Sequence, residues 1–241
     1  MRPVVRGKRP QSSKGFIEFK TYGDAKIYLI GRLGEYCSYC EVELESCLAV
    51  EHVLPKKTAV ISADEMKRRE LDWNNFLLAC SNCNSTKSNQ ETPRDDCLWP
   101  DRDNTFRAIE YSEGGLVSPN KKMPPDIIEK AKRLIHLVGL DKIPTANNGK
   151  STDLRWLHRK DIWDIATEKR EQLKEIDQKS IDIFKKFLID IAKKSGYWSI
   201  WMTVFRDDED ICRQLTEAFP GTCNDCFSDH MEPIQRKNGL C

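Results

Sequence analysis

The sequence lacks any long apolar run and carries almost no net charge. No stretch of its 241 residues approaches 18 consecutive apolar residues, so no membrane-spanning helix is predicted. The first ten residues, MRPVVRGKRP, lack the apolar core of a secretory signal, and we therefore expect a cytoplasmic protein. Hydrophobic residues make up 39% and charged residues 32%, a balance that argues against a long disordered region.

The net charge of +1 argues against a protein that binds nucleic acid through charge alone. The positive charge is local, because residues 1–36 hold eight Lys/Arg against three Asp/Glu. Residues 1–15 are expected to form an extended basic arm, and the alternative is that the whole segment is an ordinary solvated surface. If the protein acts on nucleic acid, so weak an overall field indicates that a partner contributes to binding.

Cysteine, in contrast, is abundant, and six of the ten cysteines form three Cys-x-x-Cys pairs. In a cytoplasmic protein such pairs more often bind metal or do redox chemistry than form structural disulfides. Cys37/Cys40 and Cys80/Cys83 supply the four thiolates of a tetrahedral structural zinc site, which has no open position for catalysis. The alternative is two unrelated pairs, because 39 residues separate them.

The third pair lies near the end of the sequence. Cys223 and Cys226, followed by His230, have a spacing that can bind a second zinc ion, but no fourth ligand has a persuasive position. The sequence leaves this second site open.

The residues between the first two pairs and just after the second suit phosphodiester hydrolysis. A hard ion such as Mg²⁺ or Mn²⁺ prefers oxygen ligands, which Glu51 and the side-chain carbonyl of Asn84 provide. His52 has the pKa range of a general base that takes a proton from water. Asn75 is the candidate that orients His52. Lys87, one helical turn after Asn84, is placed to contact a phosphate.

Hydrophobic spacing and breakers predict an α+β protein with a boundary near residue 120. Residues 1–120 form a mixed domain with a basic arm, and residues 121–241 an α-helical domain. The first domain contains a helix over 24–33 with Ile27, Ile30 and Leu33 on one face, a strand over 48–54, a helix capped by Asn84 or Ser85, and an irregular region up to about 122. The second contains helices over 127–138, within 154–194 and over 209–219, and a buried helix or strand over 197–205.

Residues 35–90 resemble an HNH endonuclease of the four-cysteine type, with the set His52, Asn75 and Asn84. The resemblance implies a ββα-metal core in which His52 is the general base and Asn75 supports it. It also implies that Asn84 and Glu51 bind the catalytic Mg²⁺ or Mn²⁺, beside the structural Zn²⁺. The expected activity is cleavage of nucleic acid.

The sequence also resembles, more loosely, the HNH subunits of Septu-type antiphage systems, including retron-associated ones. This resemblance covers the opening residues, the turn of Cys37 and Cys40, and the helical second half. It implies an effector nuclease controlled by an ABC/SMC-like ATPase, with DNA or RNA as substrate. The alternative function is a zinc-dependent assembly module without catalysis. The apolar second half predicts a docking surface for the partner, anchored by Trp198 or Trp201, or else a core that this half fills by itself.

Overall fold

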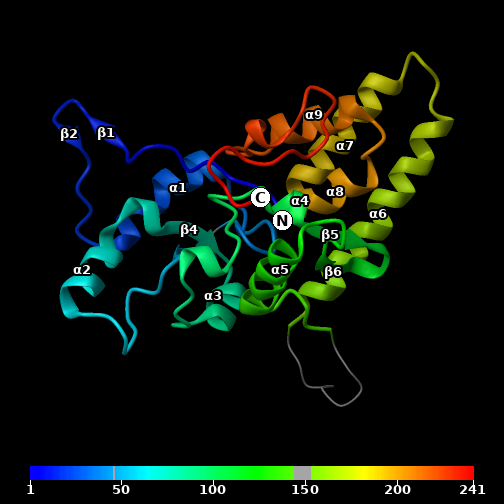
Figure 1. Cartoon of the computed structure of the whole chain (residues 1–241). Coiled ribbons are helices and arrows are strands. Elements are labelled where there is room, and N and C mark those ends of the chain that lie inside the picture. Colours follow the sequence, from blue (N-terminus) through cyan, green and yellow to red (C-terminus); the bar gives the residue numbers. More distant parts are fainter. Residues whose placement is uncertain (46, 144–152) are drawn as a thin grey trace.

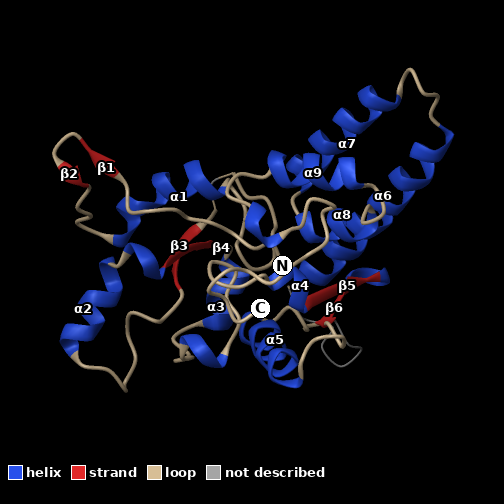
Figure 2. Ribbon diagram, turned by 45° about the horizontal axis from the view of Figure 1, so that its top comes forward, coloured by secondary structure: helices blue, strands red, loops and turns tan. Residues whose placement is uncertain are grey.

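Short strands and many helices build the protein, as Figure 1 shows for the whole chain. The computed structural model describes residues 1–45, 47–143 and 153–241. Over these residues the strands form two-stranded antiparallel sheets: β1 (Gln11–Ser12) with β2 (Gly15–Phe16), β3 (Ala49–His52) with β4 (Phe76–Ala79), and β5 (Ile109–Ser112) with β6 (Leu116–Pro119). Figure 2, in which strands are red, shows how small a part of the fold they form.

Helices form most of the regular structure. The α-helices are α1 (Lys26–Leu33), α2 (Ala63–Leu71), α3 (Ser81–Lys87), α4 (Thr105–Ala108), α5 (Pro125–Val138), α6 (Arg155–Glu175), α7 (Ile181–Ser195), α8 (Trp198–Val204) and α9 (Glu209–Ala218). Short 3-10 turns are η1 (Tyr22–Ala25), η2 (Trp73–Asn75), η3 (Arg94–Asp96), η4 (Glu113–Gly115) and η6 (Asn224–Cys226).

Strands β3 and β4 form an antiparallel pair, and α3 follows β4 directly. His52 lies opposite Phe76, and Ala49 opposite Ala79. The long segment between the two strands contains α2, whose start is capped by the Ser62 side chain accepting a hydrogen bond from the backbone N–H of Glu65. A helix therefore sits inside the connection between the paired strands.

The expected cap of the helix after the second cysteine pair was wrong. We expected Asn84 or Ser85 at this position, but α3 begins at Ser81 and its cap is Cys80. The Cys80 sulfur accepts a hydrogen bond of 3.4 Å from the backbone N–H of Cys83, which takes the part usually played by a side-chain oxygen. Asn84 consequently lies within the helix.

The expected buried face of the first helix was also wrong in part. Helix α1 ends at Gly34, as predicted, where a positive φ of 75° suits glycine. Its buried residues, however, are Leu29 and Leu33, and Ile27 is exposed. Leu29 and Leu33 are four residues apart, so they share a face that turns Ile27 outward.

The second half is mainly helical, as predicted. Helix α5 begins with a proline and ends at Gly139 in the left-handed conformation, and α9 is capped by Asp208. Helices α6 and α7 lie side by side and extend beyond the rest of the fold in both views. The region before residue 122 is more regular than expected, because it contains the hairpin of β5 and β6.

The predicted tryptophan anchors are part of the interior. Trp198 and Trp201 are both 0% exposed, so the expectation that either contacts a partner was wrong. The apolar segment around α8 fills the core instead. Because this core includes residues from both halves of the chain, it shows no boundary near residue 120, and the two-domain division stays a prediction.

Part of the basic N-terminal segment packs against the rest of the protein. Its first four residues are buried, and the guanidinium group of Arg2 donates hydrogen bonds to the carbonyls of Leu33 and Pro220. Val4 pairs with Thr222 in an isolated bridge.

Over the part of the chain that the structure describes, no helix has both the length and the apolar character needed to cross a membrane.

Candidate functional site

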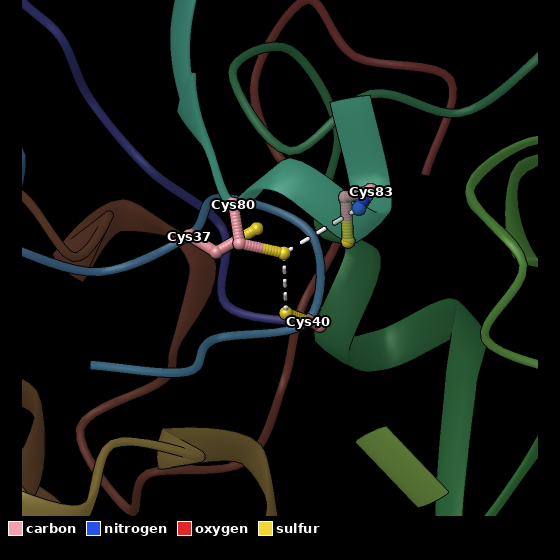
Figure 3. A group of neighbouring side chains, drawn as sticks. All are labelled: Cys37, Cys40, Cys80 and Cys83. Atoms are coloured by element: carbon pink, nitrogen blue, oxygen red, sulfur yellow. Dashed lines mark hydrogen bonds between the residues drawn. The ribbon is translucent and has the colours of Figure 1, made fainter. Parts of the chain in front are cut away.

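The four predicted zinc ligands come together in one buried group. The sulfur atoms of Cys37, Cys40, Cys80 and Cys83 lie within 4.8 Å of one another, and Figure 3 shows them converging from two turns. The sulfurs of Cys40 and Cys80 are 3.6 Å apart. Four thiolates at this spacing suit a tetrahedral zinc ion. The four-cysteine group can therefore bind zinc.

The first cysteine turn is held by its own backbone and by the second half of the chain. Glu41, directly after Cys40, has a positive φ of 67°, and its backbone N–H bonds to the carbonyl of Cys37 at 2.9 Å. The buried Glu41 carboxylate accepts hydrogen bonds from the backbone N–H and the hydroxyl of Ser199, at 2.9 and 2.6 Å. The start of α8 is thus attached to the cysteine turn.

Helix α6 contributes a second attachment. The buried guanidinium group of Arg155 lies 3.0 Å from the sulfur of Cys83 and also donates to the carbonyls of Val138 and Gly139. A cation that donates to a thiolate offsets the negative charge that four thiolates bring to a zinc site. Arg155 could not be predicted from the sequence, because nothing in its local pattern points to a distant cysteine.

The third cysteine pair does not gather a metal site. Among the described residues, Cys223, Cys226 and His230 do not form a group of ligands close enough for a shared ion. Cys223 and Cys226 are buried, whereas His230 is exposed and its Nδ1 lies 3.1 Å from a carboxylate oxygen of Glu209. In this arrangement these three residues do not form a second zinc site.

The carboxylate of Glu51 and the ammonium group of Lys87 form a buried ion pair. Lys87 Nζ lies 2.9 Å from Glu51 Oε1, and these side chains are 1% and 4% exposed. The same ammonium group donates to the backbone carbonyl of His52 at 2.8 Å. Burial raises the pKa of Glu51, and Lys87 opposes that rise. Lys87 faces inward, so the expected phosphate contact would require this pair to open.

His52 is held from three sides. Its Nε2 lies 3.1 Å from the carbonyl oxygen of Glu70, in the last turn of α2. The imidazole ring also makes edge-to-face contacts with Tyr22 and Phe76, with centroids 5.1 and 5.2 Å away. Because a carbonyl only accepts, Nε2 carries the proton in this contact and Nδ1 keeps its lone pair.

The pKa of His52 lies below its usual range. Burial is the main cause, and the positive charges of Lys56 and Lys87 act in the same direction. The imidazole is therefore neutral near pH 7, which is the form that accepts a proton.

Asn75 contacts the backbone around His52 and not its ring. The Asn75 amide donates to the carbonyls of Leu54 and Arg69, at 2.8 and 3.1 Å, and its oxygen accepts the N–H of Leu54 at 2.7 Å. Arg69 precedes Glu70, whose carbonyl contacts His52. Asn75 thus joins the end of α2 to the segment that leaves β3.

Asn84 lies three residues before Lys87 on α3 and is half-buried. Over the described residues no hydrogen bond joins its side chain to Glu51 or His52, so a metal shared by Asn84 and Glu51 stays a prediction. Tyr22 and the Glu70 carbonyl could not be predicted from the sequence, because ring packing and backbone contacts carry no signal in residue type.

Comparison with known proteins identifies one part of the chain. Residues 37–90 match the family model of the HNH endonuclease. The matched segment contains both cysteine pairs of the zinc group and the residues around His52, and it indicates nuclease activity on nucleic acid. No curated protein matches the chain.

Proposed function

We propose that the protein is a metal-dependent endonuclease whose ββα-metal unit consists of β3, β4 and α3. The observation that supports this most directly is the fixed geometry of His52 inside the matched segment: Nε2 faces the Glu70 carbonyl, and Glu51 is the neighbouring residue. A base with a fixed tautomer next to a carboxylate is what hydrolysis of a phosphodiester requires.

The residues present suit an oxygen-preferring divalent ion. The Glu51 carboxylate pairs with the Lys87 ammonium, so a bound ion would share or replace this partner. Glu51 and the side-chain carbonyl of Asn84 would hold Mg²⁺ or Mn²⁺. When bound, this ion neutralises negative charge that develops on the phosphate oxygens.

The other groups act on water and on geometry. Nδ1 of His52 accepts the proton of the attacking water, while the Glu70 carbonyl holds the ring in place. Asn75 acts as a positioning residue through the backbone of Leu54 and Arg69. The four-cysteine group, with its zinc, fixes the start of α3 and so the direction from which Asn84 and Lys87 reach the site.

We also propose that the nuclease is an effector of antiphage defence, controlled by an ABC/SMC-like ATPase. The identity of this partner rests on the sequence resemblance. An apolar row on α7 supports the existence of a docking surface: Ile183, Phe187 and Ile191 are 58%, 64% and 39% exposed. They follow one another at intervals of four residues, on a helix that extends away from the site.

A cleavage assay of the full chain tests the proposal. Purified protein is incubated with plasmid DNA and with total RNA, with Mg²⁺ or Mn²⁺, in the presence and absence of the ATPase. We expect metal-dependent cleavage by the wild type and none by Glu51→Gln. Cleavage that is equally fast in Glu51→Gln would contradict the role of Glu51 in the proposed site. No cleavage by the wild type in any condition would contradict the proposal as a whole and favour the non-catalytic assembly module.

A further inference from the structure

We infer that Lys56 contacts a phosphate of the substrate at the proposed nuclease site. This inference rests on the proposed function and assigns a residue that the site still needs. A nuclease requires a positive group that meets the phosphate backbone. Lys87, the residue first expected there, is 1% exposed and paired with Glu51.

The position of Lys56 is fixed next to His52 by an aromatic ring. Lys56 Nζ lies 3.6 Å from the centroid of the Tyr22 ring, and the same ring makes an edge-to-face contact with His52. A cation over an aromatic face is attracted by the ring. Tyr22 therefore holds the ammonium group beside the base that takes the proton.

Lys56 is also partly accessible and only weakly paired. Its side chain is 26% exposed, and its carboxylate partner, Glu70, is 44% exposed at an Nζ–Oε1 distance of 3.4 Å. Exposed pairs of this kind contribute little to stability, so a phosphate can replace the carboxylate at small cost. Glu70 thus acts twice: its carbonyl holds His52, and its side chain occupies the phosphate position.

Lys56 differs from the neighbouring basic residue Arg69 in how strongly its side chain is paired. Arg69 is 12% exposed and is bound to Glu65, Glu91 and the carbonyl of Pro55. Its guanidinium group is already satisfied by these partners. Lys57 is exposed and follows Lys56 directly in sequence, which makes it a matched control of equal charge.

The test measures binding of a DNA duplex and of a single strand by the full chain, without added Mg²⁺ or Mn²⁺, over a range of salt concentrations. For Lys56→Met we expect weaker binding and a slope of log K against log salt that is smaller by about 0.9 for the duplex or about 0.7 for the single strand. Lys56→Arg keeps the wild-type slope. Glu70→Gln binds more tightly, because the competing carboxylate is gone.

Lys57→Met gives the reference for loss of one charge at this surface. If Lys56→Met and Lys57→Met change the slope equally, or if neither changes it, the assignment of Lys56 is overturned. Thermal unfolding of each variant shows whether a folding defect accounts for weaker binding, and Lys56→Arg must then rescue binding as well as folding. A wild type that neither binds nor cleaves nucleic acid overturns the proposed function. If the wild type cleaves but Lys56→Met binds as the wild type does, only the assignment of Lys56 is wrong.

Discussion

Lys87 Nζ and Glu51 Oε1 lie 2.9 Å apart in the interior, and this pair joins the last residue of α3 to β3. Removing one partner of a buried ion pair leaves the other charge uncompensated. We therefore expect Lys87→Met to lower the free energy of unfolding by about 3–5 kcal/mol. Chemical denaturation measures this change.

The double variant Glu51→Gln/Lys87→Met is the control for this pair. It removes both charges, so its loss of stability should be smaller than that of Lys87→Met alone. If the loss of stability in the double variant equals the sum of the losses in Glu51→Gln and Lys87→Met, the two side chains do not interact. The ion pair is then not formed in solution.

His52→Ala should reduce metal-dependent cleavage by roughly 10²–10⁴, the usual contribution of a general base. The matched control is His158→Ala, which removes an exposed histidine on α6. Single-turnover cleavage gives the rate, and circular dichroism verifies the fold. Comparable rates for the two alanine variants would show that His52 is not the base.

Stability should depend on pH through His52. Its folded-state pKa is lowered from the usual 6.5, first by burial and then by Lys56 and Lys87. The folded state therefore binds this proton less well than the unfolded state, so the stability contributed by His52 is present above pH 6.5 and is lost as pH falls through the lowered value. Unfolding from about pH 7.5 to about pH 5 should show a decline that His52→Gln reduces. An unchanged pH dependence in this variant would contradict the burial of a neutral imidazole.

Elemental analysis should find one zinc ion per chain, bound by the four-cysteine group. Cys80→Ser should lose this zinc and lower the melting temperature strongly, whereas Cys47→Ser, at an exposed position, should do neither. Arg155→Met should keep the zinc but release it faster to a chelator, because Cys83 loses its cationic donor. Full zinc content in Cys80→Ser would contradict the four-cysteine site.

Phe187→Lys should weaken binding to the ATPase without changing the fold, because it places a charge in the exposed apolar row of α7. Ile27→Lys is the matched control, since Ile27 is 73% exposed on α1. Co-purification of the full-length variants with the ATPase measures the effect. Equal retention of both variants would place the docking surface away from α7.

Local patterns made part of this structure predictable. The spacing of the cysteine pairs identified the group that the structure brings together, and hydrophobic spacing with helix breakers located α5 and α9. These features depend on residues that are close in sequence or on a ligand set with a known geometry. The match of residues 37–90 to the HNH endonuclease supports the same segment that the sequence singled out.

Long-range contacts were not predictable in this way. The inward direction of Lys87 depends on burial by neighbouring elements, and the bond to His52 comes from a backbone carbonyl that every residue type possesses. Arg155 reaches Cys83 across 72 positions of sequence. For Trp198 and Trp201, an apolar composition alone did not distinguish core from interface, and the packing of α8 places them in the core.

The helix between β3 and β4 places a constraint on how this sequence can vary in length. The carbonyl that holds His52 belongs to one residue of α2, and adjacent residues of a helix point about 100° apart. Inserting or deleting a single residue between the Ser62 cap and Glu70 would rotate this carbonyl away from the ring. The stretch from Thr58 to Ile61, before the cap, can change length without that rotation. In natural variants with a different number of residues between β3 and β4, the insertions or deletions should therefore lie between Thr58 and Ile61.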